Sequence, residues 1–137
     1  MESNKQILQK FIVAAQTLDD KTVAALMHPA FVVHEAAGLP YAGEYRGLEG
    51  WQRLFSTVTG IWRDVSIKTE MYMGADDAED FAILMILSGK SPDGREDFQT
   101  RILEHWRLQD GKVIEVWPHY WDTHAMRVLY EKGQPAV

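Results

Sequence analysis

The hydrophobic pattern of the chain changes its period after residue 60, and this change most limits the folds that the chain can adopt. Near the N-terminus, apolar residues recur every three or four positions, as in a helix: Ile7, Phe11, Ala15 and Leu18. Between residues 61 and 121 the pattern is strand-like, with turn signals at 74–77, 91–94 and 109–111. Helices followed by four long strands predict an α+β domain in which a curved antiparallel or mixed sheet wraps around a helix.

The N-terminal third of the chain contains several residues that typically cap or end a helix: Ser3, Gln6, Asp19, Asp20 and Pro29. Ser3 and Gln6 have the spacing of a capping box, which predicts a first helix over about residues 4–18. One of the two aspartates can cap a short second helix, whose apolar side ends with Met27 before the proline closes it.

Two more helices are expected further along the chain. Trp51, Leu54, Phe55 and Val58 have helical spacing and predict a third helix that ends at Gly60. Asp122 is expected to cap a terminal helix whose apolar side contains Met126, Leu129 and Tyr130.

The run Phe81–Leu87 is apolar on both of its faces. A strand of this kind is typical of the centre of a sheet with cover on both sides. The second cover can come from another element of the chain or from an oligomer interface.

Two carboxylates stand on the apolar faces of predicted strands. Glu35 shares the parity of Phe31 and Val33, and Glu104 shares that of Ile102 and Trp106. An isolated ionised carboxylate in an apolar environment is costly, so the pattern implies a cavity, a partner or a raised pKa. For Glu35 the alternative is a carboxylate at a cavity rim, solvated or paired with Arg46. For Glu104 it is a buried hydrogen bond to Tyr45, Tyr72 or Tyr120.

Length and charge narrow the class of protein. The 137 residues fit one domain over 1–137, and the formal net charge of −6 argues against nucleic acid and anionic membrane as partners. The chain has no cysteine, hence no disulfide or thiolate chemistry. Its N-terminus has no basic segment that leads into a long apolar run, so we expect a cytoplasmic protein.

No familiar metal or cofactor motif is present. His34-Glu35 is followed by Gly38 where a helical zinc motif needs a second histidine. No Gly-x-Ser-x-Gly elbow occurs, and the glycines between residues 38 and 50 fit no dinucleotide fingerprint. We therefore expect neither a metal ion nor a cofactor.

Two segments carry a resemblance to a known family: Leu39–Gly47 and Val113–Thr123. Together with the order of elements, they resemble the nuclear transport factor 2-like superfamily, and within it the SnoaL-like and ketosteroid-isomerase-like proteins. The resemblance covers about residues 5–129. It implies a cystatin-like α+β cone, with N-terminal helices packed into a curved sheet.

Ketosteroid isomerases have three catalytic groups in an apolar pocket, and the resemblance implies roles for two residues here. Glu35 matches the carboxylate that moves the proton, and Glu104 matches the protonated acid that donates to the oxyanion. Phe11 stands where those enzymes have a tyrosine. In the SnoaL-type polyketide cyclases an aspartate stands at the position of Pro118 and a histidine at that of Glu104, so this chain departs from both patterns.

The residues and the resemblance together predict cofactor-independent acid-base catalysis, of isomerase or cyclase type, on a small hydrophobic carbonyl or polyketide-like molecule. Glu35 is expected to be the general base and Glu104 the protonated donor, with Tyr120 and Tyr45 as auxiliary donors. Further residues are expected to shape the pocket: Phe11, Trp51, Phe55, Trp106 and Pro118.

The opposite strand faces suggest a different role. His34 and His105 adjoin the two glutamates and therefore point to the outer face, where Trp117 and His119 are expected to join a homodimer interface. Two alternatives to catalysis stay open: a non-catalytic module that holds an apolar ligand, and a dimeric interaction scaffold.

Overall fold

A computed structural model describes residues 1–134 and shows four helices and one sheet in that part of the chain. The helices are α1 (Asn4–Gln16), α2 (Asp20–Leu26), α3 (Gly47–Ile61) and α4 (Thr123–Lys132). The strands are β1 (Met27–Glu35), β2 (Gly43–Arg46), β3 (Arg63–Met73), β4 (Asp80–Lys90), β5 (Asp97–Gln109) and β6 (Lys112–Tyr120). The predicted α+β class is confirmed.

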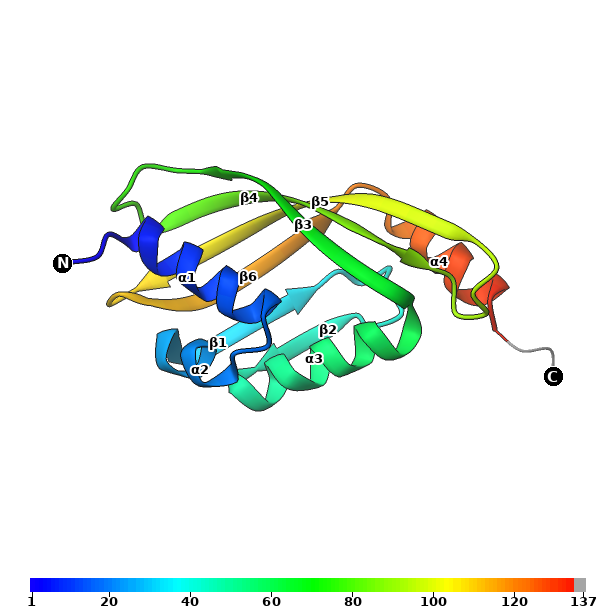
Figure 1. Cartoon of the computed structure of the whole chain (residues 1–137), viewed down its shortest axis with the longest axis horizontal. Helices are drawn as coiled ribbons and strands as arrows, with labels where there is room; N and C mark the ends of the chain where they lie inside the picture. Colours follow the sequence, from blue (N-terminus) through cyan, green and yellow to red (C-terminus); the bar gives the residue numbers. More distant parts are fainter. Residues whose placement is uncertain (135–137) are drawn as a thin grey trace.

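The strands form a curved, unclosed sheet in the order β2-β1-β6-β5-β4-β3. Only β1 and β6 run parallel, and the other neighbours are antiparallel. Helix α3 packs against β1 and β2 and reaches β3, while α1 contacts β6 and α2. Figure 1 shows α4 at the opposite end of the molecule from α1 and α2. The hollow of the sheet is thus covered by α1 and α3.

Three predicted helix caps are present. The Ser3 hydroxyl accepts a hydrogen bond from the Gln6 amide at 3.2 Å, and the Gln6 side chain accepts one from the Ser3 amide at 2.9 Å. Asp19 caps α2 through the Thr22 amide, and Asp122 caps α4 through the Ala125 amide. These contacts satisfy backbone donors that a helix leaves free in its first turn.

One prediction near the first strand is wrong, and one strand was not predicted. Met27 does not end the second helix but begins β1, which runs through Pro29. The strand tolerates this proline because its pairing with β6 shifts register between Met27 and Val32, where the ladder needs no amide donor. The segment 43–46, for which the sequence predicted no strand, forms the short edge strand β2, paired only with β1.

The core lies between α1, α3 and the inner face of the sheet. Phe11 of α1 is fully buried, and its ring meets those of Trp51 and Trp106 edge-on at centroid distances of 5.4 and 5.5 Å. Helix α3 approaches β2 so closely that a Cβ atom on Gly50 would stand 2.7 Å from the carbonyl carbon of Tyr45. Because glycine has no Cβ atom, Gly50 allows α3 to pack closely against the edge of the sheet.

The outer face of the sheet is only partly covered. In β4 the inward side chains of Phe81–Leu87 are buried, whereas the outward ones between them are half-buried. Within residues 1–134 no other element supplies the second cover, because the helices gather on the inner face; cover by an oligomer interface stays a prediction. On the outer face Leu103 of β5 and Met71 of β3 remain 45% and 52% exposed.

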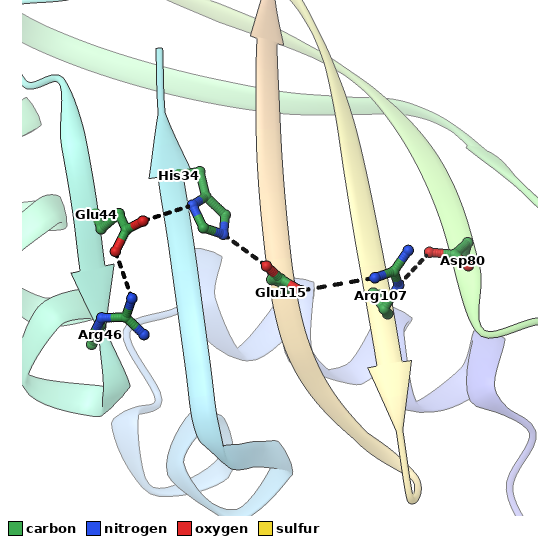
Figure 2. A network of polar contacts seen from close by, with 6 residues as sticks. All are labelled: His34, Glu44, Arg46, Asp80, Arg107 and Glu115. Carbon is green, nitrogen blue, oxygen red and sulfur yellow. Dashed lines mark hydrogen bonds and ion pairs between the residues drawn. The ribbon is translucent and has the colours of Figure 1, made fainter. Parts of the chain in front are cut away.

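Charged side chains and a histidine cross this outer face in a row. Figure 2 shows the row from β2 to β4: Arg46, Glu44, His34, Glu115, Arg107 and Asp80. Beside it the ring of Trp117 stacks on those of His34 and His105, at 5.1 and 4.8 Å. Both histidines point outward, as predicted.

Candidate functional site

A cavity of about 410 Å³ lies between the inner face of the sheet, α1 and α3. Its walls are mostly apolar, with Ile12 from α1, Leu54 from α3, and Met85 and Ile102 from the sheet. Polar atoms enter from Glu35, Glu104 and Tyr120 on the sheet, and from Gln16, Thr59 and Ser66. The chain thus holds an apolar chamber into which two carboxyl groups and a phenol project.

The sheet register brings the two carboxyl groups to one level of the cavity. Glu104 of β5 pairs with Pro118 of β6, and continuing the parallel pairing of Val33 with Val116 puts Glu35 of β1 beside the same proline. The two backbones are therefore two strand spacings apart, roughly 10 Å. Pro118 stands between them and offers no side-chain donor.

Glu35 is buried, and one of its carboxyl oxygens has no hydrogen-bond partner among residues 1–134. The residue is 9% exposed, and its Oε1 atom is buried with no hydrogen-bond partner among the described residues. Loss of hydration raises the pKa of this carboxyl to about 8, and the nearby charge of Glu104 adds to the rise. Pairing with Arg46 is wrong, because that guanidinium binds Glu44 on the outer face at 2.6 Å.

Glu104 is equally buried but has a fixed donor. The indole Nε1 of Trp106 donates a hydrogen bond to Glu104 Oε1 at 3.0 Å. Burial raises the pKa of Glu104 to about 7, while the indole bond favours the ionised form and opposes the rise. The expected tyrosine partner is wrong: Trp106 is two residues along the same strand, so it shares the face of Glu104.

Tyr120 belongs to a chain of buried donors. Its hydroxyl lies 2.7 Å from that of Tyr41, which also accepts a hydrogen bond from Trp62 Nε1 at 3.4 Å. Burial is the main cause that raises the pKa of Tyr120 well above its usual value, and the charge of Glu35 contributes. The phenol is therefore a neutral donor or acceptor at the cavity wall.

The structure places most of the predicted site residues in the cavity. Glu35, Glu104 and Tyr120 line it, together with Trp51, Phe55, Trp106 and Pro118. Phe11 and Tyr45 are not among the lining residues.

The two exceptions have clear physical reasons. Phe11 is fully buried in the aromatic cluster formed with Phe31, Trp51 and Trp106, so it supports the wall of the cavity from behind. The Tyr45 hydroxyl donates to the Tyr41 carbonyl oxygen at 2.8 Å, so Tyr45 does not supply the expected auxiliary donor.

Sequence reasoning missed Tyr41 and Trp62. Tyr41 lies between β1 and β2, where the chain has no hydrophobic period, and Trp62 lies between α3 and β3. Both rings are almost fully buried. Their aromatic character was the available signal, but only the fold shows that they meet Tyr120.

The titratable side chains that line the cavity are all acids: Glu35, Glu104 and Tyr120. Among the described residues the cavity lining contains no lysine, arginine or histidine. Nor does any group of three or more His, Cys, Asp or Glu side chains within residues 1–134 have the arrangement needed to hold a metal ion. In the same part of the chain no helix is both long and apolar enough to cross a membrane.

Comparison with known proteins identifies the neighbours of this chain. The family model of the SnoaL-like domain matches residues 8–116. A search of curated proteins finds no match.

Solved structures extend the comparison to the whole fold. An NTF2-like protein from Burkholderia thailandensis is 25% identical with a TM-score of 0.82, and the match covers 98% of this chain and 100% of that one. The structure of TerC, co-crystallised with polyporic acid, is 16% identical with a TM-score of 0.79, covering 93% and 98%. A putative SnoaL-like polyketide cyclase from Jannaschia sp. CCS1 is 14% identical with a TM-score of 0.73, covering 97% and 93%. The TerC and Jannaschia structures show that these two proteins share the fold of this chain.

Proposed function

Because the chain belongs to the SnoaL-like domain family, we propose that its cavity catalyses proton transfer next to a carbonyl group without a cofactor. One observation carries this proposal: two buried carboxyl groups, in unlike surroundings, enter the same apolar chamber. Proton abstraction beside a carbonyl needs a base that is ionised near neutral pH and a donor for the oxygen that becomes negative. Two carboxyl groups whose pKa values lie near 7 and 8 meet this need.

The proposed substrate is a small, hydrophobic carbonyl compound or a polyketide-like molecule. The largely apolar walls favour such a ligand, and a cavity of about 410 Å³ falls within the usual range for small-molecule sites. Among the related folds, TerC was co-crystallised with polyporic acid and another protein is described as a putative polyketide cyclase. These two neighbours agree with the proposal.

The proposal can be tested with 2-tetralone, an apolar ketone whose α-hydrogens are acidic. Proton NMR in deuterated buffer follows the replacement of these hydrogens by deuterium. The protein is expected to accelerate exchange about 100-fold or more over buffer, the scale of general acid-base catalysis. The double variant Glu35→Gln/Glu104→Gln is expected to lose this acceleration, and Glu131→Gln on the exposed side of α4 is the matched control.

Binding and catalysis are separated in the same samples. Trp51 and Trp106 line the cavity, so tryptophan fluorescence reports on ligand binding. Binding of 2-tetralone with exchange at the buffer rate would contradict catalysis and support the non-catalytic binding module.

We also infer that the protein is a homodimer, joined through the outer face of its sheet. Met71, Leu84 and Leu103 are neighbours on β3, β4 and β5 and form an apolar strip on that face. Such a strip is typical of an interface. A two-fold axis would bring two identical strips together, and the row of Figure 2 offers charges of both signs to a second copy, from the carboxylates of Glu44, Glu115 and Asp80 and the guanidinium groups of Arg46 and Arg107.

A further inference from the structure

We propose that Glu104 is the proton-abstracting base, that Trp106 is its positioning residue, and that Glu35 is the acid that donates to the substrate oxygen. This inference rests on the proposed function and deepens it. It assigns the two glutamates the reverse of the roles that the resemblance to ketosteroid isomerases implies. The contacts around each carboxyl group support the assignment.

The contact between Trp106 and Glu104 favours a negative charge on Glu104. An indole N–H can only donate, and here it donates to Glu104 Oε1 at 3.0 Å from within the buried core. Hydrogen bonds to an ionised acceptor are stronger than those to a neutral one. The indole also fixes one carboxylate oxygen, so the direction of the other is restricted to the cavity side.

The surroundings of Glu35 favour its protonated form. Its Oε1 atom is buried and has no partner among the described residues, and the cavity lining there contains no cation. An ionised carboxylate in this position would carry an unsatisfied charge beside a second acid. A neutral carboxylic acid offers an O–H donor to a ligand oxygen, as a catalytic acid must.

Tyr120 adds a second donor on the side of Glu35. Trp62 donates to the Tyr41 hydroxyl, and within the described chain the only other polar partner of that hydroxyl is Tyr120. Either hydroxyl of this pair can donate to the other; when Tyr41 donates to Tyr120, the Tyr41 proton has an acceptor. The Tyr120 proton then remains free for an oxygen atom in the cavity.

The reaction step balances without any co-reactant. A Glu104 oxygen takes the α-proton of the ketone, the C–H bond breaks, and its electron pair forms the carbon–carbon double bond of the enol. The carbonyl oxygen receives its proton from Glu35. In deuterated buffer both carboxyl groups exchange their protons, and the reverse step places deuterium on carbon. No atom is oxidised or reduced.

The pH profile of 2-tetralone exchange distinguishes the two assignments. In the native protein the rate is expected to rise as Glu104 ionises and to fall as Glu35 ionises; Tyr120 is the other titratable group of the lining. Glu104→Gln is expected to lower the rate about 100-fold or more. Glu35→Gln retains an N–H donor, so it should keep measurable exchange and lose the alkaline fall. The opposite pattern, in which Glu35→Gln abolishes exchange and Glu104→Gln keeps it, would overturn the assignment.

Trp106→Phe tests the positioning role. Loss of the indole donor is expected to move the rise of the profile to higher pH, since Glu104 then ionises less readily. A lower rate with an unmoved rise would show a merely structural role and overturn this part of the assignment.

A measurement on the unmodified protein keeps the assignment testable if a variant fails to fold. Carbon-13 NMR of the side-chain carboxyl groups is expected to show that Glu104 ionises at lower pH than Glu35, and the reverse order would contradict the assignment. If the native protein exchanges 2-tetralone only at the buffer rate, the proposed function fails, while the order of ionisation still decides which glutamate carries the charge.

Discussion

Replacing the unpartnered glutamate by its neutral analogue should change how the stability of the protein depends on pH. In Glu35→Gln the side chain keeps nearly the same shape but no longer titrates. Between pH 4.5, the ordinary value, and about 8, Glu35 is protonated in the folded protein and ionised in the unfolded chain. The folded state binds more protons in this window, so the unfolding free energy of the native protein must fall as pH rises through it.

The size of this fall follows from the pKa. A rise from 4.5 to about 8 corresponds to about 5 kcal/mol, at about 1.4 kcal/mol for each tenfold change in the acid constant. Domains of this size are stable by only about 5–15 kcal/mol. The native protein should therefore be much less stable at pH 9 than at pH 5. In Glu35→Gln, the part of this pH dependence that comes from Glu35 should be absent.

Urea denaturation followed by circular dichroism, at pH values between 5 and 9, measures this difference. The curves of the native protein and Glu35→Gln are expected to diverge by about 4 kcal/mol between pH 5 and pH 9, because about three of the pH units over which Glu35 stays protonated only in the folded protein lie in this range, with the variant the more stable at alkaline pH. Glu131→Gln, on the exposed side of α4, is the control and should follow the native curve. Parallel curves for the native protein and Glu35→Gln would refute the idea that burial keeps Glu35 protonated.

Three further substitutions test the interface, a helix cap and the core. Leu103→Glu places a charge on the exposed strip of β5 and should convert a dimer to a monomer in sedimentation velocity; an unchanged species would contradict the interface. Asp122→Ala removes the cap of α4 and should lower the unfolding free energy by about 1 kcal/mol, measured with urea; no loss would show that the cap is not stabilising. Ile83→Ala creates a void on the fully buried face of β4 and should cost about 2–5 kcal/mol in the same assay, whereas a cost below about 1 kcal/mol would show that the neighbours fill the void.

The helix signals could be predicted from the sequence because they act over a few residues. The caps at Ser3, Asp19 and Asp122 involve amides only three positions away. Strand parity worked for the same reason: Glu35 and Glu104 alternate with apolar neighbours, and both enter the cavity. In contrast, β2 has four residues and depends on β1 for its existence, and Pro29 is tolerated only because of a register shift with β6.

The partners of the buried groups lay beyond sequence reasoning. Tyr41 and Tyr120 are 79 positions apart in the chain, and no local pattern shows that their hydroxyls meet. The bond from Trp106 to Glu104 was within reach, since both side chains share a strand face, but a tyrosine partner was expected instead. Such contacts decide which acid holds the proton, so the roles within the pair require the structure.

The most direct test of the acid-base pair is a carbon-13 NMR titration of the side-chain carboxyl groups in the native protein, with Glu35→Gln and Glu104→Gln used only to assign the signals. Both carboxyl groups are expected to titrate well above the ordinary value of 4.5, near 7 for Glu104 and near 8 for Glu35. Titration of both groups near 4.5 would mean that the carboxylates are solvated and would contradict the account of a buried, tuned pair.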